Sequence, residues 1–132
     1  MRNSARTFLM FQGNKAEEAM NFYAATIPGS GIGEVVRWGP GGPGAEGSVM
    51  KASFTLGGQP VMCTDSPIQH DFTFTPSISF WLDCESEDEI GRLAPTLAEG
   101  GAELMPLGNY GFSRQFAWVK DRFGISWQLN LA

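Results

Sequence analysis

Apolar positions along this 132-residue chain change between the two-residue spacing of strands and the three-to-four-residue spacing of helices. The predicted elements of the first half are a strand at 6–12, a helix at 13–29, and strands at 34–38, 48–56 and 57–65. The apolar face of the helix consists of Ala16, Ala19, Met20, Tyr23 and Ile27. The first half therefore has the order strand, helix and three strands.

The second half repeats this order. Its predicted elements are a strand at 76–84, a helix at 86–101, and strands within 102–107, 112–121 and 124–131. The apolar stripe of the second helix consists of Ile90, Leu93, Ala94 and Leu97. Residues match as well, since Ala52 and Phe54 correspond to Ala117 and Val119 at an offset of 65, which becomes 66 after one extra turn residue. Because one such unit cannot bury a sheet face alone, we expect two modules at about 5–66 and 74–132.

The helix ends carry sequence signals of their own. Asn14 with Glu17, and Ser86 with Glu89, have the spacing of capping boxes. Pro95 lies inside the second predicted helix, where a proline removes a hydrogen bond and clashes with the preceding turn. We therefore predict a kink or a break at Pro95.

The predicted fold class is α+β. Two βαβββ modules are expected to join into one cup-shaped mixed sheet, with the helices on the outer face and the concave face free. The chain, residues 1–132, is expected to form a single domain, since this length buries a core without disulfide or metal.

Strand alternation sorts the side chains between helix and cup. In the third strand, Met50, Ala52, Phe54 and Leu56 are expected to face the helix, and Val49, Lys51, Ser53 and Thr55 the cup. In the last strand, Ile125, Trp127 and Leu129 are expected to face the helix. The other predicted cup residues are Phe8, Met10, Gln12, Met62, Thr64, Ser77, Ser79, Trp81, Arg114, Phe116, Trp118, Ser126, Gln128 and Asn130. These side chains either line a small-molecule pocket or pack the two halves or two subunits together.

Charge and cysteine content narrow the partners and the compartment. The net charge is −5 and the basic residues are scattered, so the basic stripe of a nucleic-acid-binding protein is missing. No run approaches the roughly 20 apolar residues of a membrane span, and no secretory leader is recognisable. Cys63 and Cys84 are expected to be reduced thiols, which predicts a cytoplasmic protein.

Four stretches carry a family resemblance: residues 8–23 (FLMFQGNKAEEAMNFY), 47–58 (GSVMKASFTLGG), 72–90 (FTFTPSISFWLDCESEDEI) and 116–129 (FAWVKDRFGISWQL). Together they resemble the vicinal oxygen chelate (VOC) superfamily of glyoxalases, bleomycin-resistance proteins and extradiol dioxygenases. The PhnB-like branch, often labelled a 3-demethylubiquinone 3-methyltransferase domain, is the most similar. The resemblance implies paired βαβββ modules and a homodimer.

In metal-dependent VOC members, four strands each supply a ligand to a divalent cation. The resemblance places these positions at Phe8, Met62, Ser77 and Gln128. Phe8 has no donor atom, Met62 is a soft ligand, and Ser77 and Gln128 are neutral. We therefore expect no metal and no other cofactor.

The expected site binds a small molecule. The ligand-binding candidates are Met10, Lys51, Met62, Ser77, Trp81, Arg114, Phe116, Trp118 and Gln128. Aromatic side chains would stack on the ligand, and Lys51 with Arg114 would hold an anionic group or would extend to the cup rim. The candidates for acid–base catalysis are His70, Tyr110 and Lys51.

Glycine-rich segments do not support a nucleotide site. Gly29, Gly31 and Gly33 form a G-x-G-x-G pattern, but it ends a helix and enters a strand, the reverse of the dinucleotide-binding order. Residues 39–47 lack the Lys-Ser/Thr of a phosphate loop, and are expected to be a flap or a surface loop.

Several hypotheses about function stay open at this point. The first is a binding protein that sequesters a small aromatic compound in a dimeric cup. The second is a glyoxalase-like enzyme, with or without a metal, and the family label adds a methyltransferase. The third is an adaptor whose cup is filled by its own side chains.

Overall fold

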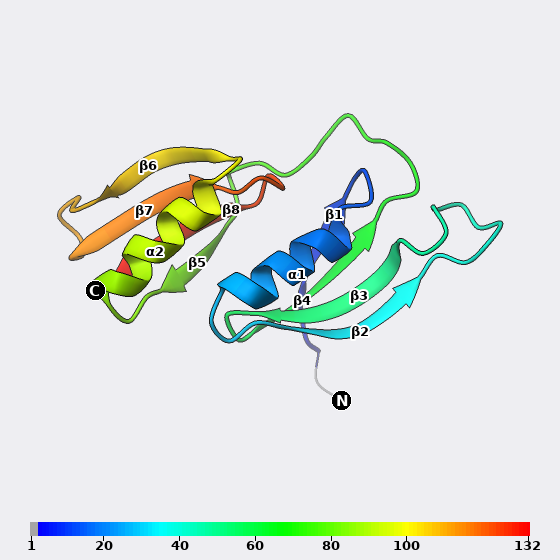
Figure 1. Cartoon of the computed structure of the whole chain (residues 1–132), viewed down its shortest axis with the longest axis horizontal. Coiled ribbons are helices and arrows are strands. Elements are labelled where there is room, and N and C mark those ends of the chain that lie inside the picture. Colours follow the sequence, from blue (N-terminus) through cyan, green and yellow to red (C-terminus); the bar gives the residue numbers. More distant parts are fainter. Residues whose placement is uncertain (1–2) are drawn as a thin grey trace. The chain divides into compact units, whose positions relative to one another are not determined.

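The chain divides between Thr73 and Phe74 into two compact units, each with one helix and one four-stranded mixed sheet. The structure, a computed structural model, describes residues 3–132 (Figure 1). We call residues 3–73 unit 1 and residues 74–132 unit 2. None of the described helices is long and apolar enough to cross a membrane.

Unit 1 contains β1 (Thr7–Phe11), α1 (Ala16–Thr26), β2 (Gly31–Arg37), β3 (Val49–Leu56) and β4 (Gln59–Asp65). Its sheet has the order β1-β4-β3-β2, in which β1 is parallel to β4 and the other pairs are antiparallel. Helix α1 is drawn in blue beside this sheet in Figure 1.

Unit 2 contains β5 (Ser79–Asp83), α2 (Glu87–Ala98), β6 (Ala102–Gly108), β7 (Gln115–Lys120) and β8 (Ser126–Leu131). Its sheet has the order β5-β8-β7-β6, again with one parallel pair, β5 with β8. The α+β class and the two βαβββ modules are thereby confirmed. The joining of the two sheets into a cup stays a prediction.

Strand register confirms the internal repeat residue by residue. In unit 1 Ala52 lies opposite Cys63, and in unit 2 Ala117 lies opposite Leu129. These pairs are related by the offsets of 65 and 66 that the sequence predicts.

The core of each unit lies between its helix and one face of its sheet. All five residues of the predicted apolar face of α1 are buried, and so are the four of α2. In the last strand Ile125, Trp127 and Leu129 are buried as predicted, and Trp127 packs against Phe80. A large apolar side chain buried in this way stabilises the fold by about 1.5–3 kcal/mol.

The predicted alternation in the third strand is wrong at its first two residues. Val49 is fully buried and Met50 is exposed, whereas the sequence predicts the opposite. The cause is a bulge: Val36 pairs with Lys51 and the next residue, Arg37, pairs with Val49, so Met50 is an extra residue. Such an insertion reverses the alternation before it.

The predicted capping box at Asn14 is also wrong. Helix α1 begins after Lys15, which has no side-chain cap, and the N–H of Ala16 donates to Asp65 Oδ1 at 2.9 Å. Glu17 instead pairs with Arg37, with Nη2 to Oε2 at 2.6 Å, and this hydrogen bond lowers the pKa of Glu17. The cap of α1 comes from a residue 49 positions away, which local spacing cannot reveal.

The cap of α2 is confirmed at Ser86, whose Oγ accepts from the N–H of Glu89 at 3.1 Å. The carboxylate of Glu89 reaches back to the N–H of Glu85 rather than to that of Ser86. Of the kink or break predicted at Pro95, the break does not occur, because α2 runs without interruption from Glu87 to Ala98, and the kink stays a prediction. Pro95 lies on the exposed side of the helix, where water can satisfy the carbonyl that loses its partner.

The glycine-rich loop at residues 39–47 is held by its own hydrogen bonds. The N–H of Trp38 donates to Ser48 O at 2.8 Å, and that of Gly47 donates to Trp38 O at 2.9 Å. Gly44 lies against the indole of Trp38 so closely that a β-carbon would come within 2.5 Å of the ring. The segment is therefore a packed surface loop of unit 1.

Candidate functional site

Three neighbouring strands of unit 2 place a glutamine between two tryptophans on the sheet face opposite α2. Trp81 on β5 lies opposite Gln128 on β8, and Gln128 lies opposite Trp118 on β7. We call these three residues the Trp–Gln–Trp row. The exposed fraction of Trp81 is 52%, and Gln128 and Trp118 are half-buried. The row therefore offers two apolar rings with one amide between them.

Two serines beside the row fix its polar groups. Gln128 Nε2 donates to Ser79 Oγ at 3.2 Å, Ser79 Oγ lies 2.7 Å from Ser126 Oγ, and Trp118 Nε1 donates to Ser126 Oγ at 2.8 Å. Ser79 and Ser126 are themselves paired across β5 and β8. Gln128 Oε1 has no hydrogen-bond partner among residues 3–132, so it can accept a hydrogen bond from a ligand.

A cluster of four aromatic rings continues the site from the row. Phe116 is 4% exposed because the rings of Trp81, Tyr110 and Phe112 surround it, with centroid distances of 5.8, 6.1 and 5.0 Å. Phe112 itself is 60% exposed. The tilted and edge-on ring pairs are geometries that aromatic side chains prefer.

Asp83 orients the edge of this site. Its Oδ1 accepts from Trp81 Nε1 at 3.0 Å and from Asn130 Nδ2 at 3.2 Å. Asn130, on β8, lies opposite Asp83 on β5 and opposite Phe116 on β7. The carboxylate thus holds the indole that the predicted ligand would meet.

Two predicted ligand-binding residues of unit 2 lie elsewhere. Ser77 is in the turn before β5, where its hydroxyl bonds Thr75, so its placement on the fifth strand is wrong. Arg114 precedes β7, and its Nε and Nη2 donate to Ala132 O at 3.2 and 2.9 Å. Neither residue belongs to the rows of β5, β8 and β7.

Unit 1 has its own open face. Phe8 lies opposite Met62, which lies opposite Ser53, and Met10 lies opposite Thr64. Phe8 is 53% exposed, Lys51 is exposed, and Met10 and Met62 are half-buried. The candidate residues Met10, Lys51 and Met62 are therefore accessible on the face predicted for them.

The hydroxyl and imidazole proposed for catalysis both have partners. Tyr110 Oη, in the loop after β6, donates to Pro106 O in that strand. His70 Nε2 lies 2.9 Å from Ser66 Oγ in the segment after β4 of unit 1. Lys51 stands on β3 of unit 1. Of the three candidates, only Tyr110 belongs to unit 2, where its ring contacts Phe116 beside the Trp–Gln–Trp row. His70 and Lys51 belong to unit 1.

The family metal positions do not match a cation site in this chain. In unit 1 Phe8 pairs with Met62, and the equivalent pair in unit 2 is Trp81 with Gln128. The fifth-strand metal position, which the resemblance places at Ser77, is therefore occupied by Trp81. Phenylalanine, thioether, indole and amide groups supply no charged donor. Within residues 3–132 no cluster of three or more His, Cys, Asp or Glu side chains could hold a metal ion.

The two cysteines are free and buried. Desolvation raises the pKa of Cys63 to about 12 and that of Cys84 to about 11. Near neutral pH both groups are therefore thiols and not thiolates, the form in which cysteine is nucleophilic.

The sequence prediction places Ser79 and Ser126 on the cup face but gives them no role, and it omits Asp83. Ser79, Ser126 and Asp83 matter because of cross-strand pairing, and alternation alone could have found Asp83 beside Trp81. Phe112 was treated as part of a strand, but it lies in the loop before β7. Its role depends on how that loop folds over Phe116.

Paired βαβββ units define a vicinal oxygen chelate fold, and solved structures share it. A glyoxalase/bleomycin resistance protein/dioxygenase from Alicyclobacillus acidocaldarius has a TM-score of 0.54 at 13% identity, covering 99% of this chain and 94% of its own. A protein from Pseudomonas aeruginosa has a TM-score of 0.81 at 28% identity, covering 98% of both chains.

The particular family follows from two further findings. A PhnB protein from Bacillus cereus is 52% identical with a TM-score of 0.93, covering 98% of this chain and 100% of its own. Residues 3–130 match the model of the family described as 3-demethylubiquinone-9 3-methyltransferase, and the chain belongs to that family. No protein of curated function matches the chain.

The G-x-G-x-G pattern at residues 29–33 lends no support to the methyltransferase description. Gly29 follows α1, and Gly31 and Gly33 lie in β2. The order helix then strand is confirmed, so the motif does not open a helix toward a cofactor. The glycines end a helix and start an edge strand.

Proposed function

We propose that this protein binds a small, flat, aromatic molecule on the open face of unit 2. The observation that carries the proposal is the Trp–Gln–Trp row, in which register places an amide between two indoles. Indole faces provide large stacking areas at little entropic cost, and each aromatic contact contributes about 0.5–1.5 kcal/mol. Apolar walls with few polar groups are typical of small-molecule sites.

Gln128 gives the proposed ligand a defined polar group. Its Nε2 is engaged by Ser79, so the carboxamide is oriented with Oε1 available. We therefore expect the ligand to carry a hydroxyl or N–H donor, which contributes about 1 kcal/mol. Arg114 donates to Ala132 O and Lys51 belongs to unit 1, so the anionic group expected from the sequence stays a prediction.

A matched ligand pair tests this proposal. 2-Naphthol has a flat ring system and a donor, and 2-methoxynaphthalene has the same ring system without the donor. We expect 2-naphthol to bind more tightly by about fivefold, measured by tryptophan fluorescence and calorimetry. Gln128→Ala should remove the difference, and Trp81→Ala should weaken both compounds, whereas Trp81→Phe should keep most of the affinity.

The same experiment can contradict the proposal. If Trp81→Ala and Gln128→Ala leave the binding of both compounds unchanged, the row is not the site. Circular dichroism of the variants keeps loss of folding separate from loss of binding, because Trp81 is half-exposed and its removal should leave the core intact.

Metal-independent and glyoxalase-like catalysis remain alternative functions, as does methyl transfer, and no contact of the described residues favours one of them.

We also propose a homodimer in the cytoplasm. Exposed Phe8 on unit 1 and Trp81 on unit 2 support the dimer, and two free thiols support a reducing compartment. Light scattering during gel filtration should give twice the chain mass of 14.3 kDa.

A further inference from the structure

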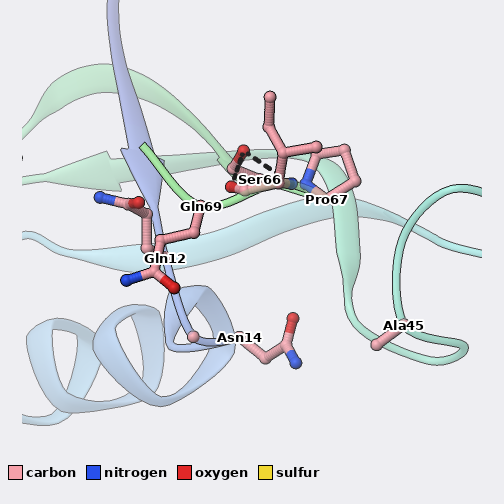
Figure 2. A pocket seen from close by; sticks show the side chains of 8 residues that line it. Gln12, Asn14, Ala45, Ser66, Pro67 and Gln69 are labelled. Carbon is pink, nitrogen blue, oxygen red and sulfur yellow. Dashed lines mark hydrogen bonds between the residues drawn. The ribbon is translucent and has the colours of Figure 1, made fainter. Parts of the chain in front are cut away.

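A cavity lies wholly within unit 1, and the residues that line it lie outside the strands of the sheet. It has a volume of about 310 Å³, the lower end of the range for small-molecule pockets. Its lining comes from three separate segments: the segment after β1, the glycine-rich loop and the segment after β4 (Figure 2). We call it the polar pocket, and the residues that matter are Gln12, Asn14, Ala45, Ser66, Ile68 and Gln69.

Hydrogen bonds hold the walls of the polar pocket in place. Gln12 Oε1 accepts from the N–H of His70 at 2.6 Å, and Gln12 Nε2 donates to Phe72 O at 2.9 Å. Ser66 Oγ contacts Ile68 O at 2.8 Å and His70 Nε2 at 2.9 Å. The protein itself therefore uses the carbonyl oxygen and the NH2 group of the Gln12 amide and the hydroxyl of Ser66.

The loop on the opposite wall is held equally well. The N–H and Oγ of Ser48 both donate to Ala45 O, at 3.0 and 2.6 Å. Asp65 connects the base of this loop to α1, because its two carboxylate oxygens accept from the N–H groups of Ala16 and Val49. The pocket is thus formed before any ligand arrives.

Two carboxamides in the pocket, those of Asn14 and Gln69, are exposed at its surface. Within residues 3–132, neither the Asn14 nor the Gln69 side chain has a hydrogen-bond partner. Asn14 also has φ of 60°, the left-handed conformation, which asparagine adopts more readily than most residues other than glycine. Figure 2 shows both carboxamides among the side chains that line the pocket.

The lining determines the class of ligand. None of the lining residues is charged, so the pocket offers no counter-ion for an anion or a cation. Each free carboxamide presents one donor group beside one acceptor, and Ile68 adds an exposed apolar side chain. We propose that the polar pocket binds a neutral small molecule that carries a carboxamide. The donor and acceptor groups of that carboxamide would pair with those of Asn14 and Gln69. This site is independent of the aromatic site of unit 2.

N-acetylglycinamide, which is neutral and has two amide groups, is the probe for this proposal. N-acetylglycine is its matched anionic control. In a ¹H–¹⁵N titration at millimolar concentrations, N-acetylglycinamide should shift the side-chain amide signals of Asn14 and Gln69 and the backbone signals of residues 66–69. Gln69→Ala should weaken binding about tenfold, the effect of losing a pair of hydrogen bonds.

Two further variants make the result specific. Gln69→Glu keeps the shape of the side chain but adds a charge and removes its donors, so it should weaken binding as well. Trp81→Ala, in unit 2, should leave the titration unchanged. The proposal is overturned if N-acetylglycinamide causes no shifts at the pocket, if N-acetylglycine binds equally well, or if Gln69→Ala has no effect on binding.

Discussion

Asp65 joins three segments of unit 1 through one buried side chain. It is 1% exposed, and its two oxygens accept from the N–H groups of Ala16 and Val49, both at 2.9 Å. Its backbone oxygen accepts from Trp38 Nε1 at 3.2 Å. Asp65 therefore holds the start of α1, the start of β3 and the Trp38 indole, which precedes the glycine-rich loop.

Asp65→Ala should lower the free energy of unfolding by about 3 kcal/mol, because two buried N–H groups lose a charged acceptor. Urea denaturation followed by circular dichroism measures the change. Glu34→Ala, at an exposed position of β2, is the control and should change stability by less than about 0.5 kcal/mol. Equal effects of the two substitutions would show that Asp65 has no special role.

The two buried thiols give a prediction about their reactivity. Since the pKa of Cys63 is about 12 and that of Cys84 about 11, thiolate is scarce in the folded protein at pH 8. Both thiols should react with Ellman's reagent far more slowly than in the urea-unfolded chain. A thiol that reacts in the folded state as fast as in the unfolded state would contradict this burial.

The same shift has a consequence for stability. Because both thiols hold their protons more tightly when folded, their contribution is fully present below the ordinary thiol pKa of 9.0 and is lost as pH rises above it. Thermal melts between pH 8 and 11 should therefore show a falling Tm, and Cys63→Ala should reduce the slope.

At the scale of elements, the two helices begin in different ways although their sequences look alike. Helix α2 has a local cap from Ser86, whereas α1 depends on the distant Asp65. Asn14, the residue that the sequence suggests as the cap of α1, lies in a left-handed turn instead.

Two substitutions should separate these cases. Ser86→Ala should destabilise the protein by about 1 kcal/mol, the usual effect of losing an N-cap. Asn14→Gly should be neutral or slightly stabilising, because glycine adopts a positive φ without strain. Chemical denaturation of both variants measures this, and a loss of about 1 kcal/mol in Asn14→Gly would restore Asn14 as a cap.

At the scale of the whole molecule, donor chemistry predicts indifference to divalent metals. Phe8, Met62, Trp81 and Gln128 occupy the positions that register makes equivalent in the two units. Elemental analysis should find no stoichiometric metal, and chelator, nickel, zinc or manganese should leave Tm unchanged. A ligand at 100 times its Kd would add about 2.7 kcal/mol, a shift of several degrees that melts easily detect. Such a shift with one metal would mean that another donor set exists.

Predictability from the sequence differs between fold and site for a physical reason. The repeat, the helix faces and the order of elements depend on local periodicity, and α1 and α2 bury the residues expected. The sheet face predicted for Met50 is wrong because Met50 is the extra residue of a bulge, and that bulge depends on how β3 pairs with β2. Ser77 was misplaced because the start of β5 is set by its register with β8.

The sequence by itself determined the α+β class and the two βαβββ units, because apolar spacing is a local property. It also determined their internal correspondence, because matching residues can be aligned directly between the two halves. It also identified Trp81, Trp118 and Gln128 as facing one side of the sheet. Only the tertiary structure decided that Gln128 stands between the two indoles and that Ser79 orients its amide. Such pairs join residues far apart in the chain, and strand register, which no short stretch encodes, brings them together.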